Sequence, residues 1–373
     1  MKAVRIDGAD RVGIVEVPAP DLELGEVLVG VRSAALCATD RRMAALGTHM
    51  PRIPGHEVAG LLEDGTAVGV HPNLGCGRCD SCAEGLENRC SDHIDIGIER
   101  DGGLAEFVSV PRSHVVPLEG FPIEVAPLVE PLATVLHAAR LLGVKEGDAA
   151  IVVGAGSLGI VGMWALQSSG ARVAVVQRSE VRRRLAADLG ADGVLGPEDD
   201  PVSVLGARPR LALVAAPGAE ALAWALEHVD VGGRVHAFAG TPGGAPVDAN
   251  LVHYRHLALV GSTGSTVEDF RRGLEFARSG RVPLDQMPVA RVPRVVRARG
   301  RARDAEDACT QDARGGGLRV RHGRTAWQRG SARQLLDEHP AAYKPIEVVM
   351  RDQADLVEVA YELHAIANYK GTS

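Results

Sequence analysis

The sequence predicts an α/β protein of two domains, a β-rich N-terminal domain followed by a doubly wound parallel sheet. Three observations predict this class. The chain has 373 residues, more than one hydrophobic core usually serves. Residues 1–130 consist of short strand-like segments separated by Pro and Gly. From residue 131 to about 265, apolar strands alternate with helices, a pattern typical of parallel sheets.

The individual elements follow from local hydrophobic patterns. In the first part, the expected strands include Glu26–Arg32, Ala67–His71 and Leu104–Val110. In the second part, the expected helices are one that follows a Gly-rich turn and runs through Ser168, and another at Val181–Leu189. The strands expected there are Ala149–Val153, Arg172–Val176, Leu211–Ala216, Arg234–Ala239 and Leu257–Gly261.

The C-terminal part of the chain has a different texture. Residues 266–293 are expected to return toward the first domain. Residues 294–334 are Arg-rich and irregular, with few apolar residues at any regular spacing, which predicts poor order. From Leu335 to the end an amphipathic pattern returns, including Val348 and Val349, and it predicts a helical tail.

The bulk composition is that of a soluble globular protein, with 46% hydrophobic and 24% charged residues. A formal charge of −7 gives no electrostatic reason to expect nucleic acid or a membrane surface as a partner. The sequence has no run of about 18 apolar residues, and its start lacks the features of a signal peptide. A cytoplasmic location is the expectation.

Four of the six cysteines form a cluster: Cys76, Cys79, Cys82 and Cys90. Four thiolates at this spacing can close a tetrahedron around Zn²⁺ with no open position, which predicts a structural zinc site. Buried or disulfide-paired cysteines are the plain alternative, but short loops rarely gather four thiols by chance. An iron–sulfur cluster is a second alternative, although the surrounding residues do not match a ferredoxin pattern.

A more dispersed set could hold a catalytic metal: Cys37 in CATD, His56 and Glu57 in PGHE, and Glu130 in EPLA. A catalytic zinc needs about three protein ligands of mixed N, S and O type and an open position. Taken singly these residues say little, because a lone Cys usually packs and a lone buried His is usually hydrogen-bonded.

A G-x-G-x-x-G motif directly follows the expected strand Ala149–Val153 and opens a helix. In this context it predicts a dinucleotide site, since the glycines allow a tight turn and a close approach of pyrophosphate to the helix N-terminus. A plain Gly-rich turn is the alternative. The motif residues singled out for cofactor binding are Gly154, Gly156, Ser157, Leu158 and Gly159.

The end of the second strand of this unit normally carries an acid that holds the adenosine ribose. Here Gln177 and Arg178 occupy that position, and Glu180 lies beyond the end of the strand. The missing acid, with Arg178 and Arg182 nearby, favours a 2′-phosphate and hence NADP over NAD. The same arginines could instead form a solvated helix face.

The order of these motifs resembles the zinc-containing medium-chain dehydrogenases. The resemblance covers about 290 residues and includes the CATD and PGHE segments, the four-cysteine lobe, EPLA and the glycine motif. It implies a GroES-like catalytic domain and a Rossmann domain, two Zn²⁺ per chain, and hydride transfer between an alcohol, polyol or sugar hydroxyl and NAD(P). It also implies a homo-oligomer, either a dimer or a tetramer.

Carried over residue by residue, the resemblance makes Cys37 and His56 ligands of the catalytic zinc. Glu57 and Glu130 match two carboxylates that take turns near the metal in the polyol, threonine and glucose dehydrogenase branch. Asp40 would accept a hydrogen bond from the second ring nitrogen of His56 and so fix its tautomer.

Thr39 matches the hydroxyl that passes the substrate proton toward solvent. Many relatives have a histidine five positions after the zinc cysteine, where this chain has Arg42. The last step of a proton relay therefore lacks its usual residue, and Arg42 could instead face a cofactor phosphate.

The tail is similar to an unrelated family. Leu335–Gly371 resembles the C-terminus of RtcB-type RNA ligases, where Tyr343 and Lys370 would lie near a bound guanylate. That family's metal ligands and guanylylated histidine have no counterpart upstream, so an RNA ligase fragment is the weakest interpretation. The junction suggests a fusion of two genes across a frameshift, and an inactive dehydrogenase-like protein that still binds zinc and nucleotide is the main alternative to an active enzyme.

Overall fold

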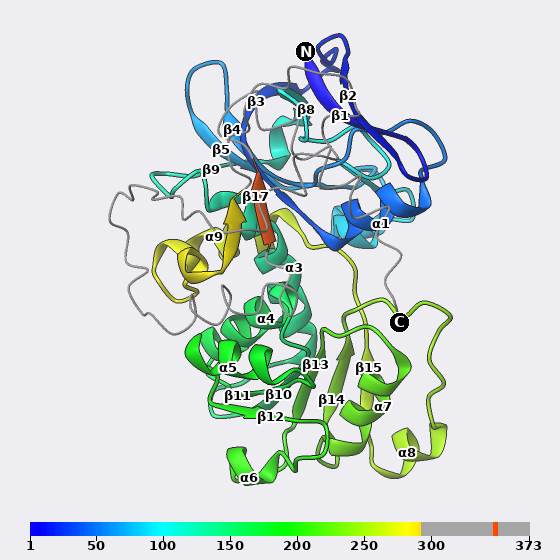
Figure 1. Ribbon diagram of the computed structural model, residues 1–373, viewed down its shortest axis with the longest axis vertical. Coiled ribbons are helices and arrows are strands. Elements are labelled where there is room, and N and C mark those ends of the chain that lie inside the picture. Colours follow the sequence, from blue (N-terminus) through cyan, green and yellow to red (C-terminus); the bar gives the residue numbers. More distant parts are fainter. Residues whose placement is uncertain (292–345, 350–373) are drawn as a thin grey trace, which may run out of the picture.

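The computed structural model describes residues 1–291 and the short strand at residues 346–349. These residues form a β-rich domain and an α/β domain with a parallel sheet (Figure 1). This confirms the fold class predicted from the sequence.

The β-rich domain is built on a seven-stranded sheet with the spatial order β16-β17-β3-β4-β5-β9, and β8 pairs with β3 beside this path. All its pairings are antiparallel except that between β16 and β17. The strands are β3 (Glu26–Leu36), β4 (Glu57–Leu61), β5 (Ala67–Val70), β8 (Phe107–Pro111), β9 (Val115–Pro117), β16 (Val289–Arg291) and β17 (Ile346–Val349).

Smaller elements surround this sheet. Two antiparallel pairs, β1–β2 and β6–β7, lie outside it. Their bounds are β1 (Lys2–Gly8), β2 (Arg11–Glu16), β6 (Asn73–Leu74) and β7 (Ile94–Asp95). The helical segments are α1 (Ala38–Leu46), α2 (Asp80–Ala83) and the 3₁₀ turns η1 (Glu87–Arg89), η2 (Arg112–His114), η3 (Ala126–Leu128) and η4 (Leu284–Gln286).

The second domain holds a six-stranded parallel sheet of order β12-β11-β10-β13-β14-β15. Numbered within the domain this is 3-2-1-4-5-6, the Rossmann order, whose reversal lies between β10 and β13. The strands are β10 (Ala149–Val153), β11 (Arg172–Val176), β12 (Gly193–Leu195), β13 (Leu211–Val214), β14 (Arg234–Ala237) and β15 (Ala258–Val260). The helices are α3 (Val129–Leu142), α4 (Ser157–Ser168), α5 (Glu180–Asp188), α6 (Val202–Leu205), α7 (Ala219–His228), α8 (Ala249–Tyr254) and α9 (Val267–Arg278).

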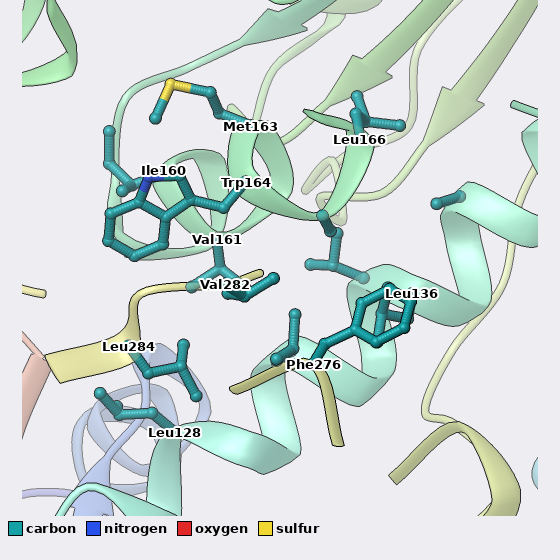
Figure 2. Packing of buried hydrophobic residues seen from close by; sticks show 14 of the residues in the cluster. Leu128, Leu136, Ile160, Val161, Met163, Trp164, Leu166, Phe276, Val282 and Leu284 are labelled. Atoms are coloured by element: carbon teal, nitrogen blue, oxygen red, sulfur yellow. The ribbon is translucent and has the colours of Figure 1, made fainter. Parts of the chain in front are cut away.

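One hydrophobic cluster joins the two sheets. It includes Ala35 and Ala59 of the first sheet, the buried faces of α3 and α4, and side chains of α9. Figure 2 shows Leu136, Trp164 and Phe276 within this cluster. Trp164 is 3% exposed and donates its indole N–H to the Leu189 carbonyl at 2.9 Å, so its polar atom is satisfied inside the core. The domains therefore share a continuous apolar interior.

The predicted strands of the parallel sheet agree closely with those observed. The bounds of β10 and β11 match the expected Ala149–Val153 and Arg172–Val176, and β13, β14 and β15 lie within the expected ranges. Strands β10 and β13 are apolar runs buried on both faces, which is the clearest strand signal a sequence carries. The expected domain boundary at residues 130 and 131 falls inside α3.

The prediction of a helical tail is wrong at residues 346–349. There the chain forms β17, which pairs antiparallel with β3 and parallel with β16. The segment reads IEVV, and β-branched residues favour a strand where an open sheet edge offers backbone partners. Residues 292–345 and 350–373, including the predicted irregular segment, Tyr343 and Lys370, lie outside the described residues.

Within the described part of the chain, no helix has both the length and the apolar character that crossing a bilayer requires.

Candidate metal centre and nucleotide site

Cys37 lies where β3 ends and α1 begins, and a buried carboxylate fixes its position. Asp40, which is fully buried, accepts a hydrogen bond from the Cys37 backbone N–H at 2.8 Å through Oδ2. Its other oxygen, Oδ1, accepts from the Gly55 N–H at 3.1 Å. One side chain thus ties the first residues of α1 to the loop before β4.

That loop delivers His56 and Glu57 to the same place. Gly55 adopts a φ of +100°, and a Cβ there would lie 2.8 Å from the Leu104 backbone nitrogen, so the turn requires glycine. Glu57 opens β4 opposite Ala35 of β3. As a result, the candidate ligand atoms of Cys37, His56 and Glu57 all lie within 4.8 Å of one another.

The polar atoms of this cluster lack partners that would satisfy them. Among the described residues, His56 Nδ1 and Glu57 Oε2 are buried with no hydrogen-bond partner. Burial, followed by the neighbouring charge of Glu130, raises the pKa of Glu57 to about 8. Burial also raises the pKa of the Cys37 thiol. A buried imidazole, thiol and carboxyl group with unsatisfied polar atoms form a ligand set that suits a divalent cation.

Asp40 and Glu130 complete the surroundings. Asp40 Oδ1 lies 3.6 Å from His56 Nδ1, which is beyond normal hydrogen-bond length. Burial alone would lower the pKa of His56, but Asp40 and Cys37 together outweigh this effect and raise the pKa well above its usual range. Glu130, the second residue of α3, does not belong to the group of ligand atoms within 4.8 Å. It is 8% exposed and accepts a hydrogen bond from Thr134 Oγ1 at 3.1 Å. Burial raises the pKa of Glu130 as well.

Thr39 and Arg42, which follow Cys37 in α1, differ in exposure. Thr39 is half-buried in the first turn of α1, next to the cluster in sequence. Arg42 is exposed one turn further along the helix.

The four clustered cysteines form a second group, with their sulfur atoms within 4.8 Å of one another and no disulfide. They come from the loop around α2 and η1. The Arg78 backbone N–H and the Cys90 side chain lower the pKa of Cys76 to about 6. This geometry fits a closed tetrahedral Zn²⁺ site.

The glycine motif forms the turn between β10 and α4. Gly154 has a φ of +109°, and a Cβ on Gly159 would lie 1.9 Å from the Gly154 carbonyl oxygen. Gly156 is the N-cap of α4, and a Cβ there would meet no atom within 4 Å. The first and third glycines are needed for packing, whereas the second leaves open space at a helix N-terminus, which suits a pyrophosphate.

At the end of β11, Gln177 is half-buried and Arg178 exposed. The nearest acid, Glu180, is held by Arg183 at 2.6 Å and by Arg184 at 3.0 Å. Arg182, one turn into α5, is half-buried. No carboxylate of this segment is therefore free to hold a ribose hydroxyl in the usual way.

Two family models match this chain. The alcohol dehydrogenase GroES-like domain matches residues 23–120, and the zinc-binding dehydrogenase domain matches residues 157–279. An L-threonine 3-dehydrogenase of Pyrococcus furiosus is 32% identical over 300 residues, which are 73% of this chain and 85% of the relative. The chain belongs to the zinc-containing medium-chain dehydrogenases.

Other members of this family are similar to the chain along most of their length. An L-galactonate-5-dehydrogenase of Escherichia coli K12 is 29% identical over 309 residues, covering 74% of this chain and 87% of the relative. A structure from Sinorhizobium meliloti 1021, described as a zinc-binding dehydrogenase bound to NADP, is 28% identical with a TM-score of 0.71. The match covers 78% of this chain and 91% of the chain in that structure. The chain is thus an oxidoreductase of the dehydrogenase class.

The structure also brings together residues that the sequence did not single out. His71, Glu87 and His114 offer ligand atoms within 4.8 Å of one another. They come from three separate segments with no characteristic spacing, so only the folded chain reveals them.

Proposed function

We propose that the chain oxidises the hydroxyl of an alcohol, polyol or sugar, or reduces the corresponding carbonyl, with a catalytic Zn²⁺ and NADP. The convergence of Cys37, His56 and Glu57, buried and with unpartnered polar atoms, carries this proposal. Glu130 is the alternative carboxylate, and the four-cysteine group would hold a second, structural Zn²⁺.

When bound, zinc would polarise the substrate oxygen and the nicotinamide would exchange the hydride. The chain's own residues position the metal ligands and transfer the proton. Asp40 holds the Cys37 and His56 segments together through two backbone amides, and its negative charge lies 3.6 Å from the imidazole. The Thr39 hydroxyl, adjacent to Cys37 in the first turn of α1, would carry the proton toward solvent. The carboxylates of Glu57 and Glu130 add acceptors that favour a substrate with several hydroxyls, in keeping with the sugar-acid dehydrogenase among its relatives.

The cofactor preference rests on the end of β11. Gln177 replaces the ribose-binding acid, and Arg178 is exposed where a 2′-phosphate would lie. Charge-assisted hydrogen bonds of this kind contribute roughly 1.5–3 kcal/mol, or about 10- to 100-fold in affinity. The Arg178→Ala variant should therefore bind NADP at least about 10-fold more weakly with little change for NAD, and Arg184→Ala, whose side chain is paired with Glu180, is the matched control.

The metal assignment is tested by removing one ligand. Cys37→Ala should lose one zinc per chain relative to the parent protein and lose turnover, measured by elemental analysis and by NADPH absorbance with a panel of alcohols, polyols and sugars. Cys309→Ala, which removes the only cysteine outside the two candidate sites, should keep both. Zinc retained in full by Cys37→Ala would exclude this residue as a ligand. Zinc and nucleotide binding without turnover on any substrate would identify an inactive relative.

A further inference from the structure

A third group of potential metal ligands lies away from both sites already described. His71 follows β5, Glu87 opens η1 within the cysteine lobe, and His114 ends η2. One ligand atom from each lies within 4.8 Å of the other two. The rings of His71 and His114 stack with their centroids 5.5 Å apart. The fold thus gathers two imidazoles and a carboxylate from three loops.

Hydrogen bonds of the two histidines leave one nitrogen of each ring without a partner. His71 is fully buried, and its Nε2 lies 3.1 Å from the Ser265 backbone carbonyl and 3.2 Å from Ser265 Oγ. Because the carbonyl can only accept a hydrogen bond, this contact favours the tautomer with the proton on Nε2. Its Nδ1 is therefore a bare lone pair, and this atom is buried with no hydrogen-bond partner. His114 contacts Ser113 Oγ through Nδ1 at 3.0 Å, and its Nε2 is likewise buried and unpartnered. Buried ring nitrogens of this kind are costly in a purely packed cluster.

The charges around the group suit a cation. Burial, followed by mutual repulsion with His114, lowers the pKa of His71 to about 3, and burial also lowers the pKa of His114. Both imidazoles are therefore neutral at neutral pH, the form that binds metals. The Glu87 carboxylate supplies negative charge while accepting the Val267 N–H at 2.6 Å. Arg271, whose charge also lowers the pKa of both histidines, is paired with Glu268 at 3.6 Å.

We propose that His71, Glu87 and His114 bind a third divalent transition-metal ion, with Zn²⁺ as the expected occupant. Two imidazole nitrogens and one carboxylate oxygen form a ligand set that Zn²⁺ accepts in tetrahedral geometry. Ser265 orients His71, and the N-terminus of α9 orients Glu87 through Val267. The ion would join the cysteine lobe, the end of β5 and the start of α9, so its role is to fix the lobe against α9.

The experiment measures bound zinc per chain after equilibration with buffered Zn²⁺ and removal of free ion. The parent protein should hold three ions, and His114→Gln and Glu87→Gln should each hold one fewer. His236→Gln is the matched control, because His236 is also fully buried with an unpartnered Nδ1 but belongs to no ligand group among the described residues. It should retain every ion. Added Zn²⁺ should raise the unfolding temperature more for the parent than for His114→Gln, because the two cysteine-containing sites bind the ion in both proteins.

Cysteine alkylation shows which ion is lost. In His114→Gln and Glu87→Gln the protection of Cys76 and Cys37 from alkylation should equal that of the parent, because the missing ion has no sulfur ligand. The proposal is overturned if the parent holds no ion beyond those of the cysteine-containing sites. It is equally overturned if the ion lost from the variants is accompanied by cysteine exposure, or if His236→Gln loses an ion too. The parent measurement decides the question even if a variant does not fold.

Discussion

At the scale of single residues, the glycine turn before α4 separates a packing requirement from a binding one. A Cβ on Gly159 would overlap the Gly154 carbonyl, whereas a Cβ on Gly156 would meet no protein atom. Gly159→Ala should therefore destabilise the protein by about 1–3 kcal/mol, the cost of overpacking. Gly156→Ala should leave the melting temperature nearly unchanged and weaken cofactor binding about 10-fold or more. Calorimetric unfolding and cofactor titration measure the two effects, and equal melting temperatures for both variants would contradict the packing argument.

His236 gives a pH dependence whose sign is fixed by its burial. Burial, then the nearby His137, lowers the pKa of His236 to about 4. The unfolded chain takes up this proton near pH 6.5 and the folded protein only near pH 4, so the stability due to the neutral ring is complete above pH 6.5 and falls as pH drops below it.

Between pH 6.5 and 5 the loss from His236 should be about 1.5 kcal/mol. Urea unfolding of the parent and of His236→Gln at both pH values tests this. The variant should lose less stability than the parent over this range by about that amount. An identical loss in both proteins would show that folding does not lower the pKa of His236.

The candidate site shows which residues a sequence can reveal. Cys37, His56, Glu57 and the four clustered cysteines stand in motifs with fixed local spacing, and the fold brings each group together. His71, Glu87 and His114 carry no such motif, because their proximity is created by three loops that meet only after the sheets pair. The 3.6 Å separation of Asp40 from His56 could not be predicted either, since it depends on two backbone amides that occupy the same carboxylate.

At the scale of elements, β17 shows how long-range pairing can override a local pattern. Strands β10 and β11 were predictable because each is an apolar run followed by a turn and a helix. Residues 346–349 sit in a segment with an amphipathic, helix-compatible order, yet they form a strand against β3 at Ala34–Leu36. The open edge that they fill lies far away in the sequence, so periodicity alone could not reveal it.

This pairing can be tested by replacing Ile346–Val349 with Gly-Ser-Gly-Ser. The change should remove β17, expose the backbone edge of β3 next to Cys37, and lower both the melting temperature and the zinc content. The same replacement at residues 351–354 is the matched control and should be milder. If the two variants unfold at the same temperature as the parent, β17 does not contribute to the sheet.

At the scale of the whole molecule, the two sheets share one apolar cluster through α3, α4 and α9. Asn88 in the first domain also lies 3.2 Å from His137 of α3, and both side chains are buried. A ligand bound at the glycine turn should therefore stabilise both domains rather than one.

NADP at about 100 times its dissociation constant should add about 3 kcal/mol to the free energy of unfolding. The protein should then unfold in a single transition at a higher temperature. Differential scanning calorimetry measures this transition with and without NADP. Tryptophan fluorescence and zinc release, recorded in parallel, show whether the two domains unfold together. Two transitions, of which only one moves with the cofactor, would mean that the domains unfold independently despite their common core.

The two hydrogen bonds that Asp40 accepts have a consequence for how an ion enters. They are made to backbone amides of Cys37 and Gly55, so one carboxylate joins the two ligand-bearing loops through bonds that do not involve the ion. Metal binding should therefore change the backbone order of these loops little, which hydrogen exchange at Cys37 and Gly55 in zinc-free and zinc-loaded protein would measure.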